Sequence, residues 1–123
     1  MNKYYFTFLL ILSQTFNLIA QPDIKIEPRN IKFEDIFSRF DYAYIYNDGD
    51  QVLYIDSLSA TKPHYILDFE NHPQLPIAVN PGDTIRLNIT LTNFYNITVN
   101  DTADTVWVYS NDSEGPRDIR IKI

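Results

Sequence analysis

Residues 84–92 read TIRLNITLT, in which apolar and polar side chains alternate without a break. Because successive side chains of a β-strand point to opposite faces, the aliphatic residues of this stretch share one face and the polar residues share the other. A strand of this kind has one face on a hydrophobic core and the other in water. The pattern therefore predicts a half-buried strand whose core residues are Ile85, Leu87, Ile89 and Leu91.

The same period of two recurs along the chain. Further strands are expected at residues 40–47, 51–58, 64–69, 104–110 and 118–123, which are rich in β-branched and aromatic side chains. Residues 23–27 and 31–33 are expected to form one edge strand broken by Pro28, because proline cannot donate a ladder hydrogen bond. With no helical periodicity, roughly seven short strands predict an all-β, immunoglobulin-like β-sandwich.

The N-terminal segment indicates export. Lys3 gives a positive start, residues 5–12 (YFTFLLIL) form an apolar run, and Ala20 is a small residue at its end. This order is typical of a secretory signal peptide, and the run is shorter than the ~20 apolar residues of a membrane-spanning helix. We predict a signal peptide over residues 1–20, one domain over residues 21–123, a secreted or periplasmic location and no membrane span after cleavage. An uncleaved anchor is the alternative.

Composition and charge narrow the classes of function. The chain has 16 acidic and 10 basic residues, which give a net charge of −6 at pH 7. Such a surface repels phosphate backbones, so nucleic-acid binding is not expected. There is no cysteine and no glycine-rich phosphate loop, and the two histidines, His64 and His72, lie in a proline-rich region without a nucleophile motif. We therefore predict no enzymatic activity and no cofactor.

Metal binding has one candidate location. The turns at residues 47–50 and 111–114 follow the strands that would be second and sixth, and those turns lie at one end of an immunoglobulin-like sandwich. Calcium prefers several carboxylate and carbonyl oxygens, but aspartate and asparagine are also ordinary turn residues. We favour the turn interpretation and predict no metal site. A calcium site is the alternative, with the ligands Asp48, Asp50, Asp112 and Glu114.

Aromatic side chains supply the candidate binding site. If the aliphatic residues of 51–58 and 104–110 face the core, alternation turns Tyr54, Trp107 and Tyr109 to the outer face. In a sandwich these strands neighbour the last one, which adds a basic residue to that face. Because aromatic and arginine side chains are typical of binding hot spots, the predicted binding residues are Tyr54, Trp107, Tyr109 and Arg120. The alternative is that the aromatic rings fill the core.

Three more tyrosines lie in residues 40–47 (FDYAYIYN). If Ala43 and Ile45 face the core, the tyrosines at 42, 44 and 46 face outward, and the reverse arrangement is nearly as consistent with the pattern. The sequence alone leaves this choice open.

Five short motifs follow one another along the chain: IKFEDI (31–36), NDG (47–49), LYI (53–55), PIAVNPGD (76–83) and VWVYSND (106–112). Their order resembles that of ASH/Hydin-type immunoglobulin-like domains, and particularly a bacterial branch found in exported proteins of Bacteroidetes-like organisms. The resemblance spans residues 31–123. It implies an immunoglobulin-like fold and no general catalytic activity. That branch often has a Cys-Gly-Cys segment after its Leu-x-Ile strand, where this chain has Ser59-Ala60-Thr61-Lys62-Pro63.

These observations together predict an exported, non-enzymatic interaction or structural module. Its partner is expected to be a protein or a cell-surface glycan. The alternative is a carbohydrate-binding module, because aromatic side chains on a flat sheet face suit the stacking of sugar rings.

Overall fold

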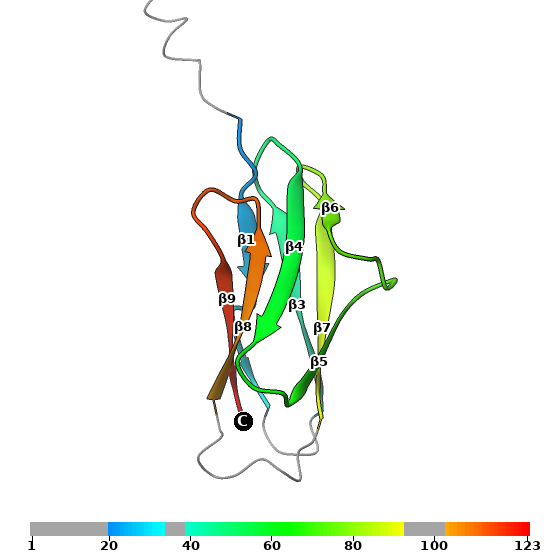
Figure 1. The fold of residues 1–123 in the computed structure, drawn as a ribbon, viewed down its shortest axis with the longest axis vertical. Helices are drawn as coiled ribbons and strands as arrows, with labels where there is room; N and C mark the ends of the chain where they lie inside the picture. The colour runs from blue at the N-terminus through cyan, green and yellow to red at the C-terminus, as the bar shows by residue number, and fades with distance from the viewer. Residues whose placement is uncertain (1–19, 34–38, 93–102) are drawn as a thin grey trace, which may run out of the picture.

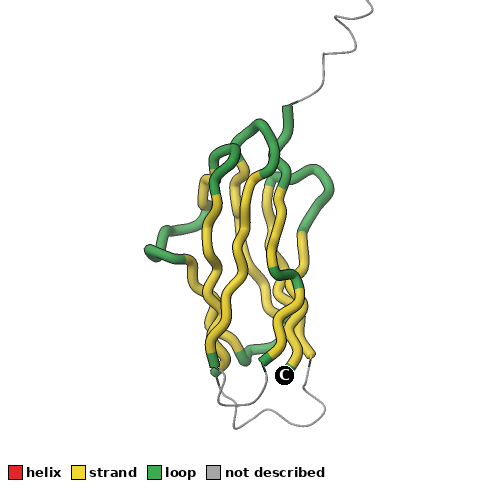
Figure 2. Tube along the Cα trace, turned by 180° about the vertical axis from the view of Figure 1, so that it is seen from behind, coloured by secondary structure: helices red, strands yellow, loops and turns green. Residues whose placement is uncertain are grey.

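The computed structural model describes residues 20–33, 39–92 and 103–123, which form nine β-strands and no helix (Figure 2). The strands make two sheets that pack face to face (Figure 1). The four-stranded sheet has the order β1-β3-β7-β5, and the five-stranded sheet has the order β2-β9-β8-β4-β6. The four-stranded sheet contains β1 (Ile24–Glu27), β3 (Phe40–Asn47), β5 (Tyr65–Phe69) and β7 (Thr84–Leu91).

The five-stranded sheet is antiparallel except for its first pair, β2 and β9, which is parallel. When β6 is set aside and the other eight strands are lettered A, A′, B, C, D, E, F and G in chain order, the two sheets read ABED and A′GFC, and β6 adds an edge strand beside C. This arrangement follows the strand order of immunoglobulin domains, so the predicted fold class is confirmed. The strands of this sheet are β2 (Asn30–Lys32), β4 (Leu53–Ala60), β6 (Ile77–Val79), β8 (Ala103–Ser110) and β9 (Arg117–Lys122).

The first segment of the domain differs from the single edge strand that the sequence predicted. β1 pairs with β3 in the four-stranded sheet, whereas β2 pairs with β9 in the five-stranded sheet. Pro28 lies between them, after a cis peptide bond. Because proline has no N–H group, the first ladder ends there, and the chain crosses to the other sheet. One segment therefore gives an edge strand to each sheet.

β6 was missed by the sequence analysis. Its three residues are too few to show a period, and its strand conformation comes from pairing with β4, in which Leu53 lies opposite Val79 and Ile55 opposite Ile77. The side chains of Ile77 and Val79 are buried. This strand and the division of the first segment raise the number of strands from about seven to nine.

The core lies between the sheets and follows the predicted alternation. Leu87, Ile89 and Leu91 of β7 are at most 2% exposed and belong to the same buried cluster as the fully buried Val106 and Val108 of β8. Ile85 is only partly buried. It packs against the edge of the core and borders a surface hollow lined by the loop after β5, by β6 and by the start of β7. Full burial on β7 therefore begins at Leu87, two residues later than predicted.

Candidate binding site

The candidate site lies on the outer face of the five-stranded sheet, where β4, β8 and β9 are neighbours as the sequence predicted. Trp107 and Tyr109 stand on β8 between buried valines and lie on the outer face, with Tyr109 exposed and Trp107 half-buried. Opposite Trp107 are Ser59 on β4 and Asp118 on β9. The tryptophan therefore has small or polar neighbours on both sides.

A β-bulge in β4 determines which β4 side chains lie beside Trp107 and Tyr109 on the outer face. The register shifts between Ile55 and Ser57, so Tyr54 before the bulge and Ser57 after it both lie on the outer face. Without the extra residue, strict alternation would put Leu58 outside. With it, Leu58 packs partly against the core, and a serine lies opposite Tyr109.

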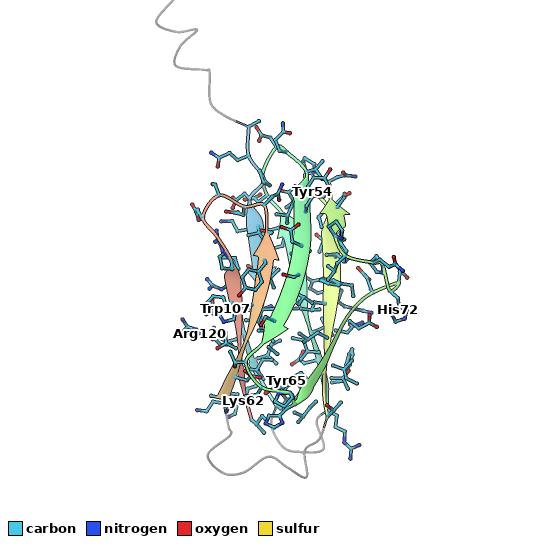
Figure 3. All side chains as sticks on the ribbon, in the orientation of Figure 1. Tyr54, Lys62, Tyr65, His72, Trp107 and Arg120 are labelled. Atoms are coloured by element: carbon cyan, nitrogen blue, oxygen red, sulfur yellow. The ribbon has the colours of Figure 1, made fainter. Side chains whose placement is uncertain are left out.

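The four predicted residues are not equally close. Arg120 pairs with Thr105, two residues before Trp107 on β8, so Arg120 and Trp107 are diagonal neighbours on one face. Tyr54 lies toward the other end of the sheet, where its backbone N–H donates to Asn111 Oδ1 at 2.8 Å. Figure 3 shows Trp107 and Arg120 together along β8 and β9, with Tyr54 near the far end of β4. Tyr54 lies opposite Asn111, two residues after Tyr109, so the structure sets the four residues in one diagonal row with Arg120 and Tyr54 at its two ends.

Asp118 positions the arginine of the site. Its Oδ2 accepts a hydrogen bond from Arg120 Nε at 3.1 Å, and its Oδ1 accepts one from Arg29. Partial burial raises the pKa of Asp118, but the hydrogen bonds and positive charges of Arg29 and Arg120 outweigh burial and hold that pKa below its usual value. Among the described residues, the Arg120 side chain bonds only through Nε, and it is 73% exposed.

A groove of about 510 Å³ continues this face across β8, β9 and β2. Thr61, Ala103 and Thr105 are its small side chains, and the long side chains of Lys32, Arg120 and Lys122 border them. A second hollow of about 150 Å³ adjoins it between Arg29, Asn30 and Arg120. The sequence analysis missed the contribution of β2 because it joined that strand to β1. The exposed-buried-exposed pattern of Asn30-Ile31-Lys32 after Pro28 is the signal that could have found it.

A second row of aromatic residues covers the outer face of the four-stranded sheet. Phe40, Tyr42 and Tyr44 are exposed, while Ala43 and Ile45 are fully buried, which settles the choice that the sequence left open. Ring centroids are 6.2 Å apart for Phe40 and Tyr42 and 5.4 Å for Tyr42 and Tyr44. The Arg86 guanidinium lies 5.5 Å from the Tyr42 centroid. These rings contact one another and an arginine of their own sheet, whereas no described aromatic ring stacks on Trp107.

The two histidines lie at opposite ends of β5. His64 is buried before the strand, and His72 follows it on an exposed turn. His72 Nδ1 is 2.6 Å from Asp68 Oδ2, and the His72 side chain is 80% exposed. The structure therefore does not bring the two candidate bases together.

The acidic turns do meet at one end of the sandwich, around a hollow of about 550 Å³. Their carboxylates bind backbone groups. Asp112 accepts hydrogen bonds from Ile24 N at 2.9 Å and Glu114 N at 2.8 Å, and Asp50 accepts one from Gln21 N at 2.8 Å. Within residues 20–33, 39–92 and 103–123, no three His, Cys, Asp or Glu side chains are placed to hold a metal ion. The described part of the chain also contains no helix long and apolar enough to cross a membrane.

Comparison with known proteins places the fold but not the activity. No protein-family model and no curated protein matches the sequence. One similar solved structure is the crystal structure of a protein of unknown function from Porphyromonas gingivalis W83, with a TM-score of 0.67 and 15% sequence identity. The similarity covers 86% of this chain and 49% of that one, so this chain spans about half the length of its structural neighbour. At this identity, the two proteins share a fold.

Proposed function

We propose that this chain is a non-enzymatic interaction module that binds its partner through the outer face of the five-stranded sheet. The observation that carries the proposal is the grouping of Trp107, Tyr109 and Arg120 on that face. Tryptophan, tyrosine and arginine are the residue types most enriched in binding hot spots. Arg120 also lines the groove at the end of this row, so a partner that contacts the aromatic rings could extend into the groove.

A carbohydrate-binding module is the second candidate, and the neighbours of Trp107 favour it. Ser57 and Ser59 on β4 are small and carry hydroxyl groups. They leave room for a flat ligand beside the indole and offer hydrogen bonds to it. An aromatic ring beside small polar residues on a flat sheet face suits a sugar ring.

Trp107→Ala tests the binding face. We expect loss of capture on an array of immobilised glycans and proteins, with a change in the free energy of unfolding below about 1 kcal/mol. The matched control is Tyr44→Ala, which removes an exposed aromatic ring from the other sheet and should leave capture unchanged. If Trp107→Ala costs about 3–5 kcal/mol of stability, the indole belongs to the core, and the proposed site is wrong.

The second part of the proposal is that the chain is exported, as a secreted or periplasmic protein. We also propose that its domain is related to the ASH/Hydin-type domains. The basic, apolar and small residues of the first 20 positions support it. Gln21, just after the expected cleavage site, is hydrogen-bonded to Asp50 and therefore belongs to the folded domain. Mass spectrometry of the native protein should find Gln21 at its N-terminus, as glutamine or in cyclised form. An intact Met1 in a membrane fraction would contradict export.

A further inference from the structure

Two lysines face each other in the groove beside the candidate site. Lys32 on β2 lies directly opposite Lys122 on β9 in the parallel ladder, and both are exposed on the outer face. Like charges directly opposite each other destabilise a sheet. No described residue forms a salt bridge with either lysine, although the chain as a whole has a net charge of −6. An anionic ligand in this groove would remove the repulsion.

Arg120 extends the positive charge toward Trp107. Asp118 holds Arg120 through Nε, so the terminal nitrogens of its guanidinium can form a pair of hydrogen bonds with a carboxylate or sulfate group. Asp118 itself is neutralised by Arg29 and Arg120. The outer face of β2 and β9 is therefore a basic surface on an acidic domain.

The groove is also lined by one carboxylate and by neutral groups. Asp104 is buried at its floor, and its Oδ1 accepts hydrogen bonds from Thr61 Oγ1 and Thr105 N, so the protein itself satisfies this oxygen. The amide of Asn30 and the hydroxyls of Thr61 and Thr105 line the groove beside the basic side chains. Thr105 is two residues from Trp107 on the same face of β8. A ligand that extends from the groove toward the middle of β8 would thus contact the basic side chains first, then the neutral hydrogen-bonding groups, and finally the indole ring of Trp107.

We propose that this groove binds an acidic polysaccharide, whose carboxylate or sulfate groups contact Lys32, Lys122 and Arg120 while a neighbouring sugar ring lies against Trp107. The inference rests on the proposed function and names the ligand class of the same face. Sugar hydroxyls match the neutral groups of the groove, and the acidic groups match its charge. An acidic peptide lacks the sugar ring that would lie against Trp107, and a nucleic acid would meet the repulsion of the acidic remainder of the domain.

The first experiment is calorimetric titration of the exported form of the protein with three polysaccharides. Polygalacturonate carries carboxylates, dextran sulfate carries sulfates, and unmodified dextran is the neutral control. We expect binding to at least one acidic polysaccharide and none to dextran, and the comparison between the two shows which acidic group is preferred. Binding should weaken as the ionic strength rises from 0.02 M to 0.5 M, because salt screens exposed charges.

The second experiment changes the charges of the groove. The double variant Lys32→Gln/Lys122→Gln should bind the acidic polysaccharide at least about tenfold more weakly, since two charge contacts are lost. Its melting temperature should stay the same or rise, because the repulsion within the ladder is removed. The control is Lys25→Gln on β1 of the other sheet, which also removes a positive charge and should leave the affinity unchanged.

The outcomes separate this inference from the proposed function. If dextran binds as tightly as the acidic polysaccharides and Trp107→Ala abolishes binding to both, the aromatic face stands and the groove inference is overturned. If polyglutamate or duplex DNA binds as tightly as the acidic polysaccharides, charge alone explains the binding, and the glycan class is wrong. If the lysine variant loses binding and Trp107→Ala does not, the groove stands and the proposed aromatic contact fails.

Discussion

At the scale of single residues, Asn47 connects three segments at one end of the sandwich. Its side-chain N–H₂ group donates to the carbonyl oxygens of Gln51 at 2.6 Å and Val79 at 3.0 Å. Its Oδ1 accepts hydrogen bonds from the backbone N–H groups of Asp23 and Gly49. The residue is 1% exposed, so water cannot replace these bonds.

Asn47→Ala should therefore cost about 2–4 kcal/mol in the free energy of unfolding, because several buried backbone groups lose their partner. Urea unfolding measures it. Asn111→Ala is the control, since Asn111 makes a similar pair of bonds to Tyr54 N and Val52 O at an exposed position. We expect the control to cost about 1 kcal/mol or less. Equal costs at the two sites would contradict the importance of burial at Asn47.

Asp118 makes stability depend on pH. Its folded-state pKa is lowered, so its contribution is fully present above the ordinary aspartate pKa of about 3.9 and is lost as pH falls through the lower folded value. Asp118→Asn should destabilise the protein at pH 7 by about 1 kcal/mol. The difference from the wild type should shrink as the pH falls below about 4.

Urea unfolding of both proteins at pH 7 and pH 3 checks this dependence on Asp118. Asp23→Asn is the control. Asp23 forms a longer, more exposed pair with Lys25 at 3.6 Å, so its replacement should change stability by less than about 0.5 kcal/mol. A loss that stays the same at both pH values would show that Asp118 acts through its shape rather than its charge.

At the scale of elements, β7 shows how far alternation alone can predict a structure. The period of two in residues 84–92 predicted the strand and its buried face, because a half-buried strand needs that pattern, whereas its central place in the sheet comes from pairing with β3 and β5. The incomplete burial of Ile85 was not predictable, since it depends on a hollow formed with β6 and the loop after β5. Local sequence determines which face of a strand is apolar, and tertiary contacts determine where burial begins.

Part of the candidate site could likewise be predicted from the sequence, and part could not. The outward direction of Trp107 and Tyr109 followed from the valines beside them, and the place of Arg120 followed from the order of the last strands. The groove could not be predicted, because it depends on the parallel pairing of β2 with β9 and on the crossover at Pro28. Pairing between segments far apart in the chain leaves no local period.

Leu87→Ala tests the core face of β7. Leu87 is fully buried, so we expect a loss of about 2–5 kcal/mol in the free energy of unfolding. Thr90→Ala, on the opposite face of the same strand, should change it by less than about 0.5 kcal/mol. Denaturant unfolding of both variants measures the difference. Similar small losses at the two positions would mean that the register of β7 against β3 is wrong.

At the scale of the whole molecule, the start of the domain is held at the acidic end of the sandwich. Gln21 N donates to Asp50 Oδ1 at 2.8 Å, Asp50 N donates to Gln21 O at 3.1 Å, and Ser113 Oγ donates to Gln21 Oε1 at 2.8 Å. Gly49 makes this approach possible, because a Cβ there would lie 2.2 Å from Gln21 O. Residues 21–23 are therefore a fixed part of the fold.

Cleavage after Ala20 would convert the backbone N–H of Gln21 into a positively charged amino group beside the Asp50 carboxylate. We expect protein that begins with a free Gln21 to have a higher melting temperature than the same protein acetylated at Gln21, because acetylation removes that charge. Asp50→Asn should abolish most of the difference, since the attraction needs both charges. Differential scanning calorimetry of the four proteins at pH 6 and low salt makes the comparison. Equal melting temperatures for the free and acetylated proteins would show that the hydrogen bonds alone fix Gln21, and that processing adds nothing to the stability of the domain.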